Sequence, residues 1–232
     1  MNLQDLLTQL FPDGCRVSTN DWLVTGEATV SGKSVSILGT TNHTFIGVRE
    51  VVVLSGKFLD IAERFPGRPI LMLVDNNGQR MALDEELLAL PEYIAHLLKA
   101  EQAARLAGCK LIAIVYGNTV AGGFIGFGMG ADRVVSVPGG ETSVMKLEAI
   151  SRVTKMPLEK LQDLAAKIPV FAPGCENFFK MGGLYEMWTD DFPAQLQRLI
   201  SSDVSQDLRA QLGRERGGRG AAQSVIDEVL RS

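Results

Sequence analysis

Two continuous apolar runs constrain the fold of this chain more than any other feature. They are "RPILMLVD" at 68–75 and "CKLIAIVYG" at 109–117. A strand with one face in water alternates apolar and polar residues, whereas a strand of a parallel sheet covered on both faces is apolar throughout. Segments with apolar residues at helical spacing, 47–65 and 83–108, precede the two runs. This alternation predicts an α/β fold with a mainly parallel sheet and flanking helices.

Other segments extend this prediction. Alternating β-branched residues at 25–41 indicate an antiparallel hairpin, and 132–138 is predicted as a third buried strand. The helix over 83–108 is expected to kink or break near Pro91. We predict a polar turn at 76–80 and a loop that enters a helix after 117. Further predicted elements are helices at the N-terminus and at 157–167, 176–183, 193–201 and 221–232, and a short strand at 184–189.

Composition limits the classes of function. The 232 residues carry a formal net charge of −4 and are 46% hydrophobic, which predicts one globular domain without a basic surface for nucleic acid. The arginine-rich stretch 213–220 is interpreted as a flexible linker, so we divide the chain into a domain at 1–204 and a C-terminal linker and helix at 205–232.

The chain shows no sign of a membrane segment or of a disulfide framework. Apolar runs are too short to span a bilayer, and the N-terminal helix carries acids unlike a signal peptide, so a cytoplasmic location is expected. Three widely spaced cysteines predict neither disulfides nor a metal site. His43 and His96 lack a Cys or His at ligand spacing, and we expect no bound metal.

The stretch "YGNTVAGGFIGFGMGADRVVSVP" at 116–138 holds five glycines within nine residues, at positions 122, 123, 126, 128 and 130. It has no acid before Asp132 and matches neither of two phosphate-binding motifs, nor the G-x-S-x-G motif of a serine nucleophile. The N–H groups that begin a helix have no partner within it, and glycine lets a ligand approach them closely. Gly122 and Gly123 are therefore predicted to stabilise a developing oxyanion. Gly126 and Gly130, four apart on one helix face, are predicted to let that helix pack tightly against the sheet.

These features together resemble a known family. The strand ending in "VDNNGQ", the "GNTVAGG" turn into a helix, and the segments 141–156 and 168–188 are similar to the carboxyltransferase branch of the crotonase superfamily. Within that branch, residues from about 25 to 200 resemble the gamma subunits of biotin-independent malonate decarboxylases.

The resemblance implies a crotonase-like fold and an enzyme that is active only in a complex. The expected partners are a beta subunit and an acyl carrier protein, in a hetero-oligomer whose active site lies between the beta and gamma subunits. The reaction would convert a malonyl thioester on the carrier into an acetyl thioester and CO₂. This chain itself would bind no cofactor, the carrier would bear a prosthetic group related to dephospho-coenzyme A, and biotin is not expected.

The resemblance also assigns expected roles to residues. Gly122 and Gly123 would be the oxyanion donors of this subunit, and Gly78 lies where crotonase folds supply another donor. Asn118 and Thr119 either bind the carrier-linked substrate or a carboxylate, or stabilise only their own backbone. Glu148 lies near the place where hydratase relatives keep an acid; the alternative is an ion-paired surface glutamate.

Three other functions stay open at this point. A self-sufficient acyl-CoA hydratase or isomerase needs paired carboxylates near the oxyanion hole, and the stretch 116–131 has none. The chain can instead be a structural subunit whose partner holds the chemistry, or a carboxyltransferase subunit that works with biotin on another protein. Asp75 and Asn76 are interpreted as capping or turn residues, and Asp132 and Arg133 as a structural pair.

Overall fold

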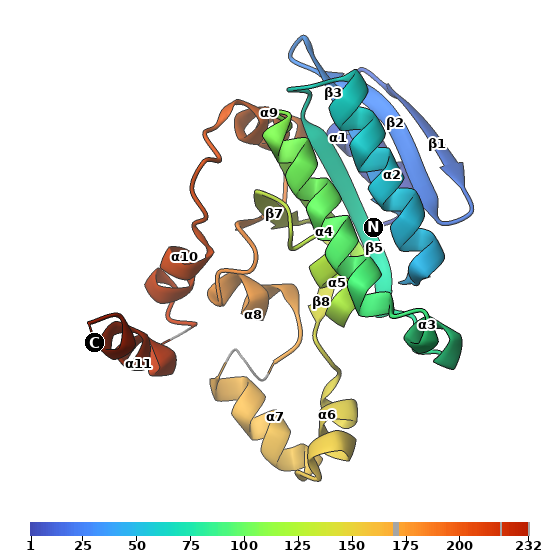
Figure 1. The fold of residues 1–232 in the computed structure, drawn as a ribbon. Helices are drawn as coiled ribbons and strands as arrows, with labels where there is room; N and C mark the ends of the chain where they lie inside the picture. The colour runs from blue at the N-terminus through green and yellow to red at the C-terminus, as the bar shows by residue number, and fades with distance from the viewer. Residues whose placement is uncertain (169–171, 219, 232) are drawn as a thin grey trace.

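The computed structural model describes residues 1–168, 172–218 and 220–231. Within these residues a nine-stranded sheet has the order β1-β2-β3-β5-β6-β7-β9, with β4 added beside β5 and β8 beside β6 (Figure 1). The strands are β1 (Cys15–Asn20), β2 (Leu23–Val30), β3 (Lys33–Thr40), β4 (Thr44–Ile46), β5 (Ile70–Gln79), β6 (Leu111–Val120), β7 (Arg133–Ser136), β8 (Glu141–Ser143) and β9 (Glu186–Met187).

Helices cover both faces of this sheet, and α6 (Leu147–Thr154) and α7 (Leu158–Lys167) extend away from it (Figure 1). The helices are α1 (Leu3–Leu10), α2 (Val48–Arg64), α3 (Leu83–Leu87), α4 (Leu90–Leu106), α5 (Ala121–Gly126), α6 (Leu147–Thr154), α7 (Leu158–Lys167), α8 (Cys175–Lys180), α9 (Phe192–Ser201), α10 (Arg209–Glu215) and α11 (Gly220–Arg231). Ser232, the last residue of the helix predicted at 221–232, lies outside the described residues, as do 169–171 of the segment 168–188.

The sheet combines an antiparallel part with a parallel part. β1, β2 and β3 pair antiparallel, and the turn between β2 and β3 places Ser31 and Gly32 at positive φ, as a tight hairpin requires. From β3 through β5, β6 and β7 to β9, every neighbouring pair is parallel. The predicted hairpin and the predicted α/β fold with a mainly parallel sheet are both confirmed.

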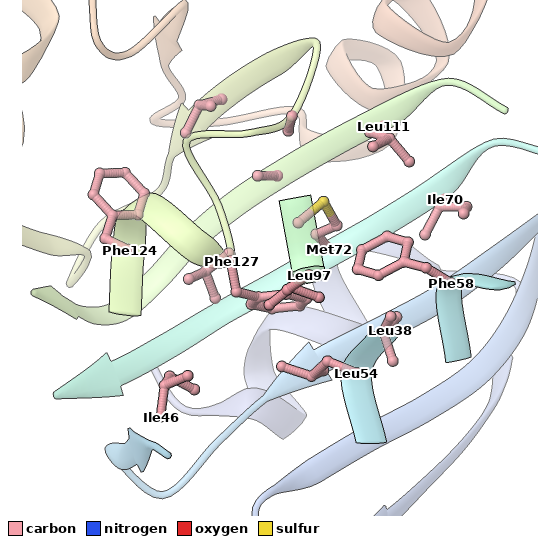
Figure 2. Packing of buried hydrophobic residues seen from close by; sticks show 14 of the residues in the cluster. Leu38, Ile46, Leu54, Phe58, Ile70, Met72, Leu97, Leu111, Phe124 and Phe127 are labelled. Carbon is pink, nitrogen blue, oxygen red and sulfur yellow. The ribbon is translucent and has the colours of Figure 1, made fainter. Parts of the chain in front are cut away.

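Apolar layers cover both faces of β5 and β6, which explains the two continuous apolar runs. Met72 of β5 lies in one apolar cluster with Phe58 of α2, Leu97 of α4 and Phe127, which follows α5 (Figure 2). Leu73 belongs to the opposite cluster, which includes residues of α1 and α9. Each strand is thus buried on both sides, as expected for a parallel sheet between helical layers.

The kink or break predicted near Pro91 is a complete break between two helices. α3 ends at Leu87 and α4 begins at Leu90, with Pro91 in the first turn of α4. Ala89 between them has φ of +57°, in the left-handed region. Proline is tolerated in a first helical turn because its missing N–H would have no helical partner there.

Two predictions about strand ends are wrong. The sequence predicts a turn at 76–80 and a loop after residue 117, but β5 continues to Gln79 and β6 to Val120. The added residues pair with β4 and β8, including Asn118 with Glu141. The short strands β4 and β8 supply backbone partners from distant parts of the chain, and this pairing overrides the local turn preference of Asn and Gly.

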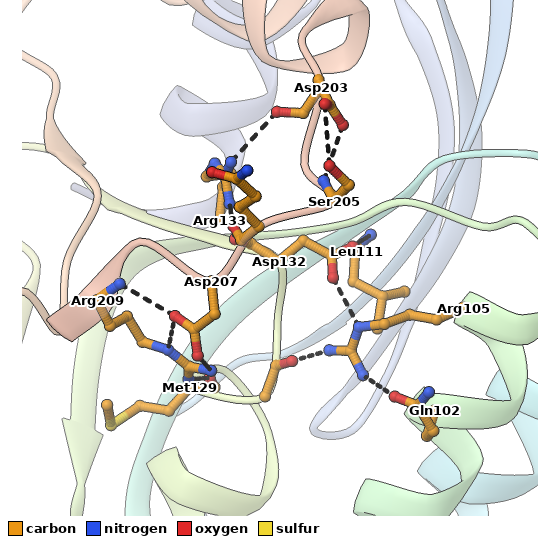
Figure 3. Close-up of polar contacts among 12 residues, drawn as sticks. Gln102, Arg105, Leu111, Met129, Asp132, Arg133, Asp203, Ser205, Asp207 and Arg209 are labelled. Carbon is orange, nitrogen blue, oxygen red and sulfur yellow. Dashed lines mark hydrogen bonds and ion pairs between the residues drawn. The ribbon is translucent and has the colours of Figure 1, made fainter. Parts of the chain in front are cut away.

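The segment after α9 lies against the main body of the protein. Arg133 donates hydrogen bonds to the carbonyl oxygens of Asp203 and Gln206, and Arg209 donates to that of Met129 (Figure 3). Arg216 donates to three carbonyl oxygens of residues 179–185, and its guanidinium lies 3.7 Å from the centroid of the Phe179 ring. The described residues of the expected linker are therefore held by specific contacts, and the division at residue 204 stays a prediction.

Candidate functional site

The candidate site lies at the carboxyl ends of β5 and β6, where Asp75 organises the backbone. The pairing of these strands shifts after Val74, because β6 carries additional residues opposite Asp75. The Asp75 carboxylate accepts hydrogen bonds from the backbone N–H groups of His43 and Asn118, each at 2.9 Å. A Cβ on Gly117 would collide with this carboxylate, so the bulge requires glycine there. Asp75 joins β4, β5 and β6, which is a wider role than the expected turn chemistry.

His43 forms a pair with Asp75 that the sequence did not predict. The imidazole Nδ1 lies 2.6 Å from Asp75 Oδ1, and the histidine side chain is 59% exposed while that of the aspartate is 5% exposed. The two residues are 32 positions apart and meet only because β4 adds to β5. Spacing along the chain carries no signal for such a pair.

The structure brings together the three glycines that the resemblance singled out. Gly122 and Gly123 lie in the first turn of α5, immediately after Ala121, whose φ of +43° is unusual for a residue with a side chain. A Cβ on Gly123 would lie 2.7 Å from the Cα of Gly78, so the two backbones are in direct contact. This junction between strand and helix is where the predicted donors meet.

Side-chain amides already contact two of these donors. The Gly122 N–H donates to Gln79 Oε1 at 2.9 Å, and the Gly78 N–H donates to Asn76 Oδ1 at 3.1 Å. The Gly122 donor is therefore engaged by a side chain rather than by a carbonyl of its own helix. Both acceptors come from the end of β5.

Gly126 and Gly130 allow a close approach to the helix α4 and not, as predicted, to the sheet. A Cβ on Gly126 would lie 2.8 Å from Ile94 Cγ2 of α4, and one on Gly130 would collide with the carboxylate of Glu101, also on α4. Gly126 is the last residue of α5, and Gly130 lies beyond that helix. The prediction of close packing is confirmed, but its partner is another helix.

A pocket of about 430 Å³ lies beside β6 and β8 and contains two of the expected substrate-binding residues, Asn118 and Glu148. Asn118 Nδ2 donates to Asn77 Oδ1 at 2.9 Å, so two carboxamides form part of the wall. The other polar and charged residues of the wall are Glu141, Thr142, Ser143 and Lys146, and its apolar residues are Val120, Leu147 and Pro173.

Thr119 does not reach this pocket. Its side chain is fully buried, and its hydroxyl donates to the carbonyl oxygen of Glu141 at 3.0 Å, across the contact between β6 and β8. Successive residues of a strand point to opposite faces, which separates Thr119 from Asn118 and Val120. The structure therefore unites Asn118 with Glu148 and leaves Thr119 in the sheet.

Glu101 on α4 is a second ionisable group that the sequence did not single out. It is fully buried, and neither of its carboxylate oxygens has a hydrogen-bond partner among the described residues. Burial raises the pKa of Glu101 to about 8, with Arg105 lowering it and Asp132 raising it to smaller extents. Arg105 instead donates to Asp132 and to the carbonyl oxygen of Gly130 (Figure 3).

Comparison with protein families decides the relationship of this chain. The sequence model of the malonate decarboxylase gamma subunit family matches residues 41–232. The chain belongs to this family. The earlier resemblance is thus confirmed.

Curated relatives of this gamma-family chain are carboxyltransferases. A malonyl-S-ACP:biotin-protein carboxyltransferase of Malonomonas rubra is 31% identical over 180 residues, which are 69% of this chain and 62% of that protein. The alpha subunit of the acetyl-coenzyme A carboxylase carboxyl transferase of Parvibaculum lavamentivorans is 28% identical over 116 residues, 50% of this chain and 35% of that one. The chain therefore spans less than two thirds of the length of either protein.

Solved structures confirm the crotonase-like fold. A Pseudomonas malonate decarboxylase hetero-tetramer in complex with coenzyme A contains a chain with a TM-score of 0.72 and 23% identity, covering 97% of both chains. A transcarboxylase 12S structure has a TM-score of 0.69 and 18% identity, covering 86% of this chain and 40% of that one. Identities this low establish the shared fold only.

Among the described helices, none combines the length and the apolar composition of a membrane-spanning segment.

Proposed function

We propose that this chain is the gamma, carboxy-lyase subunit of a biotin-independent malonate decarboxylase. With a beta subunit, it would convert malonyl-S-acyl carrier protein into acetyl-S-acyl carrier protein and CO₂. The observation that carries this proposal is the family match over residues 41–232. The glycine junction and the adjoining pocket supply groups suited to this chemistry.

The reaction needs stabilisation of negative charge more than it needs a nucleophile. When the bond between the α-carbon and the carboxylate breaks, CO₂ leaves and the electron pair forms a thioester enolate, with charge on the carbonyl oxygen. A proton added to the α-carbon then completes the acetyl thioester. Fixed N–H dipoles near that oxygen lower the barrier, and one such donor contributes about 3–4 kcal/mol. In this proposal the N–H groups of Gly122 and Gly123 are the donors, and Gly78 supports them from β5.

The pocket beside β6 suits the neutral part of a carrier-linked substrate. Its wall carries the carboxylates Glu141 and Glu148 but one ammonium group, Lys146, so an additional anion is disfavoured there. Asn77 and Asn118 present carboxamides, which pair well with the amides of a pantetheine-type arm. The chain would thus bind no cofactor of its own, and a dephospho-coenzyme A-type group on the acyl carrier protein would deliver the substrate. Asn118 would orient that arm, with Glu148 at its border.

The proposed partners follow from the relatives. The Pseudomonas structures are a malonate decarboxylase hetero-tetramer and an MdcD–MdcE hetero-dimer, and the name of the Malonomonas rubra protein specifies malonyl-S-ACP. We therefore propose a hetero-oligomer of this chain with a beta subunit, acting on an acyl carrier protein in the cytoplasm.

Carboxyl transfer to biotin is the second candidate function, because the Malonomonas rubra relative is a biotin-protein carboxyltransferase. In that reaction the carboxyl group passes to a biotinylated protein and is not released directly. Sensitivity of the native reaction to avidin would favour this alternative.

Reconstitution tests the proposal. The chain, its beta subunit and the carrier are purified separately, and CO₂ release from a malonyl-labelled carrier is measured for each combination. We expect turnover only with all three and without inhibition by avidin. Decarboxylation by the beta subunit and carrier at full rate without this chain, or hydration of an enoyl-CoA by this chain alone, would contradict the proposal.

A further inference from the structure

The Gln79 side chain already accepts a hydrogen bond from one of the proposed oxyanion donors. Its Oε1 accepts the Gly122 N–H at 2.9 Å. A Cβ on Gly122 would lie 2.9 Å from the same oxygen and 3.2 Å from Gln79 Cδ, so the carboxamide lies directly against the glycine backbone. A thioester oxygen and Gln79 Oε1 therefore compete for one N–H group.

Gln79 is held loosely enough to leave. It is the last residue of β5 and is half-buried. Besides the bond to Gly122, its Nε2 lies 3.7 Å from Met81 Sδ, and a thioether is a weak acceptor. Met81 itself is 77% exposed. Displacing the carboxamide breaks one hydrogen bond between neutral groups and lets the side chain turn toward water.

A second, independent group beside the junction points to a ligand that accepts hydrogen bonds. Asn76 is fully buried; its Oδ1 accepts the Gly78 N–H and lies next to Gly123. Its Nδ2 has no partner within the described part of the chain. A buried donor without a partner is costly, and such groups in native proteins call for an acceptor that completes them.

We propose that Gln79 is a latch that closes the donor site of Gly122 and is displaced by the carbonyl oxygen of the acyl thioester. The latch rests on the proposed function, because it regulates the same site. The bond to Gln79 satisfies the Gly122 N–H and orients it in the empty subunit. Part of the binding free energy of the substrate is then spent in replacing this acceptor, so Gln79 sets the apparent affinity of the complex for the thioester.

The test uses the reconstituted complex with three variants. Gln79→Ala removes the competing oxygen, Gln79→Glu places a charged acceptor at the same point, and Gln211→Ala is a matched control. Gln211 is exposed on α10, where its Nε2 donates to Glu215. We expect Gln79→Ala to lower KM for the malonyl carrier about three- to tenfold, the value of one hydrogen bond, without reducing kcat. Gln79→Glu raises KM, because charged acceptors bind N–H groups more strongly. The control changes neither constant.

Amide exchange of Gly122, followed by NMR in the isolated chain, tests the contact without turnover. Exchange becomes faster in Gln79→Ala than in the wild type if the latch exists. An active complex in which Gln79→Ala leaves KM unchanged, raises KM or lowers kcat would overturn the latch alone, as would unchanged exchange at Gly122. A wild-type complex without decarboxylase activity would overturn the proposed function and the latch with it.

Discussion

The two halves of β5 and β6 differ in what holds them in place. In the first half, residues 70–74 and 111–115, the side chains are apolar and buried in two clusters on either side of the sheet. In the second half, residues 75–79 and 116–120, side-chain hydrogen bonds of Asp75 and Asn118 join the two strands, and that of Gln79 joins β5 to α5.

This difference explains where the candidate site lies. Dispersion and burial in the first half depend on volume and tolerate exchange among apolar residues of similar size. Hydrogen bonds in the second half depend on the position of individual atoms, and they hold backbone N–H groups at defined places. Oxyanion stabilisation needs donors that are already oriented. In the proposed mechanism the apolar half supplies a rigid base, and the polar half holds the donors.

The largest effect is expected for Asp75→Ala. The substitution leaves the backbone N–H groups of His43 and Asn118 without their acceptor, and we expect the free energy of unfolding to fall by about 3–5 kcal/mol. Urea denaturation measures this loss. His43→Ala is the matched control, which removes only the half-exposed ring and should cost about 1 kcal/mol or less. Equal losses in the two variants would contradict the role given to Asp75.

The variants Gly123→Ala and Gly122→Ala compare two neighbouring glycines of α5, the helix that follows the polar half of β6. The new Cβ at 123 would lie 2.7 Å from backbone atoms of Gly78, whereas the one at 122 meets the movable end of Gln79. We expect a loss of about 2–4 kcal/mol for Gly123→Ala and about 1 kcal/mol or less for Gly122→Ala. Thermal or urea unfolding distinguishes them. Similar stability of both variants would show that the contact with Gly78 is not tight.

Glu101→Gln concerns a polar side chain on the apolar side of the comparison. Glu101 is a fully buried carboxyl group on α4, the helix that covers the apolar half of the strands. The pKa of Glu101 is raised to about 8 in the folded protein, above the ordinary value of 4.5. Between these two values the unfolded chain binds fewer protons, so the free energy of unfolding of the wild type falls as pH rises. The glutamine variant lacks this dependence.

We expect the free energy of unfolding of Glu101→Gln to exceed that of the wild type by an amount that grows from about pH 5 to pH 8 and reaches roughly 2–4 kcal/mol. Above pH 8 this difference stays constant. Chemical denaturation at a series of pH values measures the difference. A difference that is constant with pH would mean that the buried carboxylate is already ionised in the fold.

The smallest effect is expected in the pocket. Asn118→Ala should raise KM for the malonyl carrier about three- to tenfold with little change in kcat, because it removes one orienting hydrogen bond. Thr119→Val should lower stability by about 1 kcal/mol, through its lost bond to Glu141, and leave KM unchanged. Steady-state kinetics of the complex checks both. The opposite pattern would place the substrate on the Thr119 side of β6.

The sequence predicted the apolar half of this comparison well and the polar half poorly. Local patterns predict the two buried strands and the break at Pro91. A strand that is buried on both faces is a continuous apolar run in the sequence, as at 70–74 and 111–115, and proline cannot donate a helical hydrogen bond. The extension of β5 to Gln79 depends on pairing with Thr44–Ile46, and the partners of Asp75 come from residues 43 and 118. Such contacts depend on the assembled sheet, so spacing could not reveal them. The glycines at 122 and 123 are predicted as donors because a ligand can approach backbone N–H groups most closely where there is no side chain, and this role stays a prediction. Nothing in the sequence around Gln79 indicates its contact with Gly122.

The central claim is that the Gly122 N–H stabilises the enolate oxygen, and replacing one atom tests it most directly. Incorporating glycolic acid at position 122 converts the amide into an ester, which deletes the donor and adds no side chain. We predict that kcat for release of CO₂ by the reconstituted complex falls about 100- to 1,000-fold, the typical cost of one oxyanion donor, with assembly and folding retained. An ester variant that assembles normally and decarboxylates at the wild-type rate would contradict the claim.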